Sequence, residues 1–236
     1  MTKRIFKTVV VLVLFIISTT GFAADKYQWK FSGTENNCQT YTSVVPGKDY
    51  IAAKATCVIP ARMETIGVIL RDIASYPRWM EDCKETKMLK VYDPENDGFI
   101  FWFRQHIPLK TDRDMVLKSR VDLDLKNGKD IIYADLTNEI PYDAGKGYVR
   151  MSSFKSVWSL EWVDREHTRV TFMIDPDLGD GIPKFVATSL IKNNPFKSLK
   201  RMMKIVKDSK YIEEGRKSRY NKLIEEAIQG GYVKMK

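Results

Sequence analysis

Residues 106–120 read HIPLKTDRDMVLKSR, and this stretch decides which face of a strand is buried. Side chains alternate along a strand, so Arg113, Met115 and Leu117 lie on one side and Asp114 lies on the other. The apolar members of the first set face the interior, and they take Arg113 with them. An arginine cannot release its proton to escape burial, so an unpaired Arg113 would cost several kcal/mol. The stretch therefore predicts a strand whose arginine has an internal partner, or an interior that is wet.

Strands with short connections make up the middle of the chain. The runs are rich in β-branched and aromatic residues, and turns with Pro, Gly, Asn or Asp separate them. The runs are TKMLKVYD, GFIFWFRQHI, MVLKSRVDLDL, DIIYADLT, GYVRMSS, SVWSLEWVD and TRVTFMID. Consecutive strands joined by such short turns must be antiparallel, so the sequence predicts an antiparallel sheet.

Two predicted helices flank these strands. Apolar residues at helical spacing predict a helix over residues 60–73, after a first hairpin. The stretch IPKFVATSLIKNNPFKSLKRMMKIVKD, residues 182–208, predicts a long helix with a bend before Pro195. The chain has no internal repeat and no low-complexity linker, which indicates one domain.

The amino terminus has the pattern of a secretory signal peptide. Lys3, Arg4 and Lys7 precede a short apolar run, and small residues follow at cleavage spacing. The run is too short for a lasting transmembrane helix, so we expect residues 1–23 to be removed. An uncleaved membrane anchor is the alternative. We expect the mature chain to be soluble and either periplasmic or secreted.

Two cysteines flank the first hairpin. The strands TYTSVV and YIAAKATCV are separated by PGKD, in which Gly47 and Lys48 are expected to form a two-residue loop. With that loop Cys38 lies directly opposite Cys57, and a cross-strand disulfide is possible in an oxidising compartment. A slip of one residue would place the thiols on opposite faces, so two unbridged cysteines are the alternative. Cys83 is expected to be a small, partly buried hydrophobic residue.

Positive charge is concentrated at the carboxyl end. From Lys192 to Lys236 the chain has 13 Lys and Arg against 5 Asp and Glu. Nucleic acid is not expected as a partner, because an exported protein is separated from the nucleic acids of the cell. Aromatic residues are also not interleaved with the lysines for base stacking. Anionic phospholipid headgroups fit better, and a solvated helix surface is the alternative for most of these lysines. We expect residues 211–236 to form a basic helical tail.

Five pieces of the sequence, taken in order, resemble the START (steroidogenic acute regulatory protein-related lipid-transfer) domain family. They are YPRWMEDCKETKML, IPLKTDRDMVLKSR, GKGYVRMSSFKSVWSL, TRVTFMIDPDLGDGIP and NPFKSLKRMM. The resemblance spans nearly the whole mature chain, and we assign residues 24–210 to this domain. It implies an α+β helix-grip fold, in which a curved antiparallel sheet wraps around a long carboxyl-terminal helix and encloses an apolar cavity. Members bind sterols, phospholipids or other apolar molecules and move them between membranes, and the wider superfamily includes cyclases and hydrolases.

The resemblance, combined with strand alternation, predicts the wall of a lipid site. Arg113 matches the RD motif of the family, in which the arginine points into the tunnel and meets an acidic residue or the ligand. Phe103 lies where the acidic partner is expected, so a ligand group, bound water or a carboxylate elsewhere in the core is expected to pair with Arg113. Plain core packing is the alternative for the apolar positions. The predicted ligand-binding residues are Phe101, Phe103, Arg113, Met115, Trp158, Phe172, Ile174, Phe185 and Leu190.

The long carboxyl-terminal helix is expected to be a lid that also contacts membranes. Lysines flank an apolar stripe on this helix, and such an arrangement can lie at an anionic surface. The bend before Pro195 would let the helix move. A stripe packed permanently on the sheet is the alternative. The predicted membrane contacts are Lys197, Lys200 and Lys204.

The sequence offers little for catalysis. His106 and His167 have no metal-site spacing and no evident nucleophile, and there is no CxxC pair, phosphate loop or dinucleotide fingerprint. We therefore expect a monomeric, non-catalytic carrier of one sterol, phospholipid or fatty-acid-like lipid, with no cofactor and no bound metal. A cyclase- or hydrolase-type enzyme with a similar cavity is the alternative. A third hypothesis is an envelope scaffold whose basic tail adheres to membranes.

Overall fold

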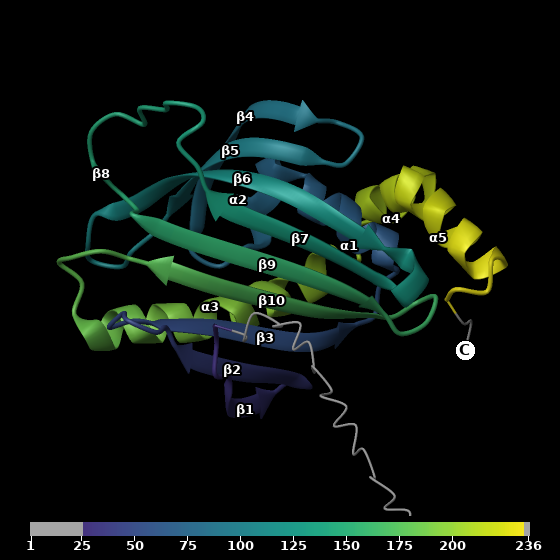
Figure 1. Ribbon diagram of the computed structural model, residues 1–236, viewed down its shortest axis with the longest axis horizontal. Helices are drawn as coiled ribbons and strands as arrows, with labels where there is room; N and C mark the ends of the chain where they lie inside the picture. The colour runs from purple at the N-terminus through teal and green to yellow at the C-terminus, as the bar shows by residue number, and fades with distance from the viewer. Residues whose placement is uncertain (1–25, 234–236) are drawn as a thin grey trace, which may run out of the picture.

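The structure, a computed structural model, describes residues 26–233. The expected signal peptide, residues 1–23, lies outside the described residues. No helix within the described range is long and apolar enough to cross a membrane. Figure 1 shows a broad sheet with one long helix along its inner side and two short helices at one end.

Ten strands form a single sheet. They are β1 (Lys30–Glu35), β2 (Cys38–Val44), β3 (Ile51–Ile59), β4 (Cys83–Asp93), β5 (Gly98–Gln105), β6 (Asp112–Asp124), β7 (Lys129–Leu136), β8 (Tyr148–Arg150), β9 (Ser153–Trp162) and β10 (Thr168–Asp177). The strand order is β1-β2-β3-β10-β9-β7-β6-β5-β4, all antiparallel, and β8 pairs with β6 in parallel. The outer strands β1 and β4 do not meet, so the sheet is curved but open. The predicted antiparallel sheet is confirmed.

Helices cover the hollow side of the sheet. The long helix α3 (Lys184–Ile205) lies against β3 and β10, and α1 (Met63–Arg71) and α2 (Tyr76–Trp79) lie between β3 and β4 in the chain (Figure 1). Short 3-10 helices follow α1 (η1, Ile73–Ser75) and β6 (η2, Leu125–Asn127). The helix predicted over residues 60–73 is shorter, because Asp72 leaves helical conformation with ψ at 72°. The helix-grip fold is confirmed.

The helix α3 runs without interruption through Pro195. Phe196, Leu199 and Met202 are buried in the main hydrophobic core. Their spacing of three residues places them on one side of the helix. Most of the apolar stripe that we expected to face a membrane therefore packs against the body of the protein.

The expected helical tail is helical over residues 211–217 and 219–229, and these residues pack against the body of the protein. The assigned boundary falls inside α4 (Ser209–Lys217), which is followed by α5 (Arg219–Gln229). Both helices contact α1. A side chain on Gly215 would place its Cβ 3.0 Å from the Cα of Thr65, so glycine permits the close approach of α4 to α1. Apolar residues buried in the two helices, and not only their charges, decide where this segment lies.

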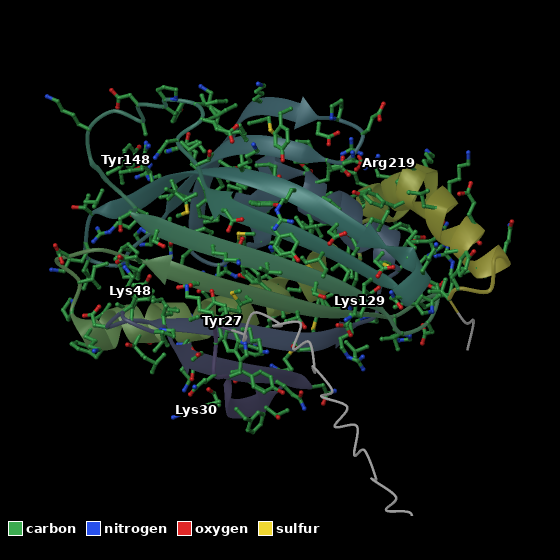
Figure 2. The ribbon with its side chains drawn as sticks, viewed as in Figure 1. Tyr27, Lys30, Lys48, Lys129, Tyr148 and Arg219 are labelled. Atoms are coloured by element: carbon green, nitrogen blue, oxygen red, sulfur yellow. A yellow bond between two sulfur atoms is a disulfide. The ribbon has the colours of Figure 1, made fainter. Side chains whose placement is uncertain are left out.

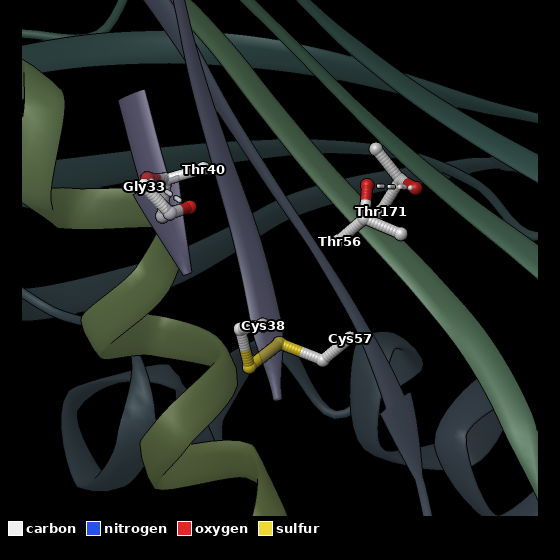
Figure 3. Close-up of a disulfide and its surroundings, with 6 residues drawn as sticks. All are labelled: Gly33, Cys38, Thr40, Thr56, Cys57 and Thr171. Carbon is white, nitrogen blue, oxygen red and sulfur yellow. Dashed lines mark hydrogen bonds between the residues drawn. A yellow bond between two sulfur atoms is a disulfide. The ribbon is translucent and has the colours of Figure 1, made fainter. Parts of the chain in front are cut away.

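The first hairpin has the predicted register. Cys38 pairs with Cys57 across β2 and β3, and the two residues form a disulfide with a Cα–Cα distance of 4.4 Å (Figure 3). The neighbouring strand β10 is joined to β3 by a hydrogen bond of 2.8 Å between the hydroxyls of Thr56 and Thr171. The disulfide therefore fastens β2 to β3, and β3 is joined to the rest of the sheet through β10. Cys83 is buried with a free thiol, as expected.

Arg113 is buried as predicted, but its partners are backbone carbonyls. Its Nε donates to the Leu178 carbonyl at 2.7 Å, and its two terminal nitrogens donate to the carbonyls of Thr111 and Asp180 at 2.7 and 2.9 Å. Burial lowers the pKa of the guanidinium. The arginine thus joins the β5–β6 loop, residues 106–111, to the β10–α3 loop, residues 178–183. The expected carboxylate or ligand partner is not what satisfies its donors.

Asp114, the next residue, lies on the opposite face of the same strand and is the centre of a hydrogen-bond network there. It is buried, and both of its carboxylate oxygens accept from Arg150, at 3.0 and 2.7 Å. The indole nitrogen of Trp102 also donates to Asp114, at 2.9 Å. Arg150 in turn donates to the Tyr142 carbonyl at 2.8 Å. The segment before β8 is thereby held over a small apolar cluster on the outer face of the sheet.

Reduction of the disulfide should destabilise the protein. A bridge between residues separated by 19 positions stabilises by roughly 3 kcal/mol, because it restricts the unfolded chain. We expect urea unfolding with a thiol reductant to show a loss of about this size. A double Cys38→Ala, Cys57→Ala variant should be insensitive to reductant. Peptide mapping of non-reduced protein that found both thiols free would contradict this prediction.

Replacement of Arg113 by Leu should destabilise the protein by about 3 kcal/mol, because the loop carbonyls lose a charged donor. Arg120→Leu is the matched control: Arg120 lies on the same strand but is exposed and stacks 3.8 Å from the centre of the Tyr133 ring. Its removal should cost less than about 1 kcal/mol. Urea unfolding measures both values. Unchanged stability of the Arg113 variant together with altered lipid selection would restore a ligand-binding role.

Candidate functional site

A cavity lies between the concave face of the sheet and the helices. It contains about 900 Å³ of space between atoms, part of which is open to solvent. Alternation places every second side chain of β5, β6, β7, β9 and β10 toward it. The lining residues are Gly67, Leu70, Arg71, Ile73, Tyr76, Met80, Glu81, Asp97, Phe99, Phe101, Phe103, Gln105, Leu117, Ser119, Val121, Asp130, Ile132, Ala134, Phe154, Ser156, Trp158, Phe172, Ile174, Pro176, Asn194 and Tyr220.

Five of the predicted ligand-binding residues lie in this wall: Phe101, Phe103, Trp158, Phe172 and Ile174. Trp158 and Phe172 are opposite each other on β9 and β10, and their rings stack with centroids 3.8 Å apart. Each of the five side chains is buried. The middle of the cavity is therefore an aromatic and aliphatic surface suited to an apolar molecule.

The other four predicted ligand-binding residues are not in the wall. The donors of Arg113 are bonded to carbonyls of the two loops. Met115 is fully buried in the packed core, whereas Leu117, two residues further along the same face of β6, lines the cavity. Phe185 is 77% exposed, because it lies on the outer side of the first turn of α3. Leu190 is partly buried against the core. Strand or helix periodicity alone does not tell a cavity wall from solid core.

The three predicted membrane lysines lie on the outward side of α3. Lys197 pairs with a Glu81 oxygen at 3.1 Å, and Lys200 lies 3.9 Å from a Glu35 oxygen. Lys204 is exposed. These contacts leave much of each ammonium group in solvent, and contact with a membrane stays a prediction.

The cavity has a polar group at one end around Glu81. The backbone N–H of Glu81 donates to the Ser198 hydroxyl at 3.1 Å, and the Asn194 amide donates to the Glu81 carbonyl at 3.0 Å. The Glu81 carboxylate pairs with Lys197 and, at 2.5 Å, with Arg201. These contacts attach the second half of α3 to the α2–β4 connection. We call this region, with the β5–β6 loop, the β10–α3 loop and the start of α3, the loop end.

A second polar group, which the sequence did not indicate, lies at the other end of the cavity. It comprises Arg71, Asp97, Asp130 and Tyr220, and Arg219 is beside it. Asp97 accepts from the Tyr220 hydroxyl and pairs with Arg71 at 3.0 Å and with Arg219 at 3.1 Å. Because α5 supplies Tyr220 and Arg219, we call this region the α5 end. The available signal was Asp130 in DIIYADLT, which alternates in phase with the inward Ile132.

Neither histidine lines the cavity. His106 lies 2.9 Å from a carboxylate oxygen of Asp112, and His167 lies 2.9 Å from one of Asp164, both in loops. The Cys83 thiol is buried, and burial raises its pKa, which keeps it protonated. Within residues 26–233 no group of His, Cys, Asp and Glu side chains is arranged to hold a metal ion.

Comparison with known proteins identifies the family. The family model of the START domain matches residues 18–211. An uncharacterized protein of Pseudomonas aeruginosa is 26% identical over 197 residues, which cover 82% of this chain and 92% of the relative.

Two solved structures have the same fold. A STAR-related lipid transfer protein from Xanthomonas axonopodis matches with a TM-score of 0.68 and 20% identity, over 76% of this chain and 99% of that one. Human STARD10 matches with a TM-score of 0.66 and 18% identity, over 82% of this chain and 78% of that one. The helix-grip architecture, the cavity beneath the sheet and the family match agree: this chain belongs to the START domain family.

Proposed function

We propose that the protein binds one lipid in its cavity and carries it within the cell envelope. The observation that carries the proposal is the apolar wall between two polar ends, formed by Phe101, Phe103, Trp158, Phe172 and Ile174. The names of the Xanthomonas relative and of the START family support lipid as the ligand class. The basis of affinity is burial of apolar surface: several hundred Å² at about 25 cal/mol per Å² gives on the order of 10 kcal/mol before the cost of association.

The protein acts without catalysis under this proposal. The described cavity wall contains neither histidine nor cysteine, and none of its carboxylates is hydrogen-bonded to a serine or threonine side chain within the described residues. Export is also part of the proposal, supported by the signal-peptide pattern of residues 1–23 and by the Cys38–Cys57 disulfide, which requires an oxidising compartment to persist. The carrier works as a monomer, periplasmic or secreted, with no nucleic-acid partner.

Lipid passes beneath the first half of α3. From residue 184 to residue 193 only Ile191 is buried, whereas six of the next nine residues are. Among the described residues, Asn194 is the first residue of α3 whose side chain forms a hydrogen bond outside the helix, and Lys197 and Ser198 follow. The second half is therefore an anchor and the first half is the part with the fewest contacts, so the first half serves as the lid.

The loop end contacts the membrane during transfer. Leu109 and Phe185 are among the most exposed large apolar side chains, at 101% and 77%. They lie on segments that Arg113 joins, since it bonds to carbonyls of both loops. Figure 2 shows Tyr148 and Lys48 at this same end of the molecule, opposite Arg219. Apolar side chains at a loop tip, with lysines on α3 nearby, fit a transient contact with an anionic bilayer.

Organic extraction of protein purified from its native envelope should release one lipid per chain. Mass spectrometry identifies and counts the lipid, and a subsequent titration of the empty protein with the same lipid should restore the ratio. Protein that carries no lipid and converts a hydrolysable or cyclisable substrate would instead establish an enzyme.

The double change Leu109→Ser, Phe185→Ser should slow lipid transfer between anionic vesicles at least about fivefold, because apolar insertion into the bilayer is lost. Equilibrium binding of lipid should not change. Val58→Ser with Val91→Ser is the matched control, since these side chains are 43% and 48% exposed on strands β3 and β4. Fluorescent lipid transfer measures the rates. Equal transfer rates for the two double variants would show that Leu109 and Phe185 do not contact the bilayer during transfer.

Neutralising Lys197, Lys200 and Lys204 to Gln should slow transfer to anionic vesicles at low salt, because each lysine near the surface contributes about 1 kcal/mol. Transfer to neutral vesicles should stay the same. Lys217 and Lys222, 80% and 81% exposed at the α5 end, provide the control pair. A rate that depends neither on vesicle charge nor on these three lysines would show that their charge serves solubility.

A further inference from the structure

Asp130 is a buried carboxyl group with no partner in the part of the chain that the structure describes. It is 3% exposed and lines the cavity, and its Oδ1 has no hydrogen bond although that atom is out of reach of bulk water. A buried carboxyl group without a partner costs free energy, so such groups are retained where they do something else. Asp130 is therefore the group at the α5 end whose bonding capacity is unused.

The surrounding cations are already committed to Asp97. That carboxylate takes Arg71, Arg219 and the Tyr220 hydroxyl, and these contacts come from α1 and α5. Arg219 and Lys129, labelled in Figure 2, lie at the same end of the molecule. Asp97, Arg71 and Arg219 together carry a charge of +1, and an ionised Asp130 brings the site to zero net charge. Both arginines are already held by Asp97, so neither is directed at Asp130.

The α5 end is far from the loop end along the cavity. On β6, Arg113 pairs with Gln105 at one end, and Leu123 pairs with Asp130 at the other. The ten steps from Arg113 to Leu123 span about 33 Å along the curved strand. The helix that covers the α5 end lies beyond residue 211, where the family match stops. Tyr220 and Arg219 of this polar site therefore come from beyond the family match, whereas Arg71, Asp97 and Asp130 lie within it.

The protonation of Asp130 limits the kind of group that suits it. Burial, then the negative charges of Asp97 and Asp122, raises its pKa to about 7, and Arg219 opposes this rise. Near neutral pH the group is thus a mixture of an acid, which can donate, and a carboxylate, which can only accept. A hydroxyl group can accept from the acid and donate to the carboxylate. A ligand carboxylate can only accept, so it loses its hydrogen bond to Asp130 and is repelled whenever Asp130 is ionised.

We propose that Asp130 is the binding site for the uncharged hydroxyl of a single-headed lipid alcohol, which lies with its apolar chain along the aromatic wall. This inference rests on the proposed function, because it names the class of lipid that the same cavity takes. Asp130 touches the ligand directly. Asp97, Arg71 and Tyr220 hold the site around it.

The test compares three probes of equal chain length on delipidated full-length protein: 1-tetradecanol, tetradecanoate and tetradecane, each titrated and counted by native mass spectrometry. We expect the alcohol to bind at least about tenfold more tightly than tetradecanoate. Asp130→Leu should weaken alcohol binding about tenfold and strengthen tetradecane binding, because the polar group is replaced by apolar wall. Asp130→Asn, which keeps a donor and an acceptor, should retain the preference for the alcohol.

Controls separate this inference from the proposed function. Asp135→Leu removes a carboxylate from the outward face of the same strand and should leave all three affinities unchanged. Thermal unfolding checks that each variant folds, and Asp130→Leu should not lower stability, since it removes an unpaired buried group. Equal binding of the alcohol and tetradecanoate, or of the alcohol to wild type and Asp130→Leu, would overturn the inference while lipid binding stands. Failure of all three probes to bind would overturn the proposed function itself, and recovery of chemically altered alcohol would show an enzyme.

Discussion

An open, curved sheet cannot fill its own hollow, and the rest of this structure follows from that constraint. Ten strands leave one concave face, and α3 covers only the part of it next to β3 and β10. The side chains that point inward from β5, β7 and β9 have no second sheet to pack against, so space stays beneath them. Stacked Trp158 and Phe172 narrow this space without closing it. The fold thus supplies the cavity, and polar groups lie at its two ends.

Local patterns in the sequence were sufficient for the frame of the protein. Counting residues outward from the turn correctly paired Cys38 with Cys57. The expected Gly47–Lys48 two-residue loop is wrong, because the turn is closed by a hydrogen bond from the Lys48 N–H to the Val45 carbonyl. Alternation likewise placed Phe101, Phe103 and Phe172 on the inner face. It also predicted that Arg113 is buried. These features depend on neighbours in the chain or across one turn, where few geometries compete.

Features that join distant segments could not be read in this way. The carbonyls that satisfy Arg113 belong to Leu178 and Asp180, 65 and 67 positions away, and any residue supplies such a carbonyl. Tyr220 was placed in a basic tail because charge hid the buried side of α5, whose apolar residues recur at helical spacing. Asp130 alternates in phase with the inward Ile132, but β7 has apolar residues on both faces, so this signal did not distinguish a cavity-lining side chain from an exposed one.

The two ends of the cavity differ in how firmly they are held, and this difference would set the orientation of a bound amphiphile. Bonds at the α5 end join α1, α5 and the β4–β5 turn through Asp97, so this end is rigid. The first half of α3, at the loop end, has few contacts and lies beside exposed Leu109 and Phe185. With its hydroxyl at Asp130, a lipid alcohol has its apolar chain toward the lid. Under the proposed opening of α3, the chain would meet the bilayer first, so apolar surface would move from protein to membrane without crossing water. Only the proposed hydrogen bond at Asp130 would have to break afterwards.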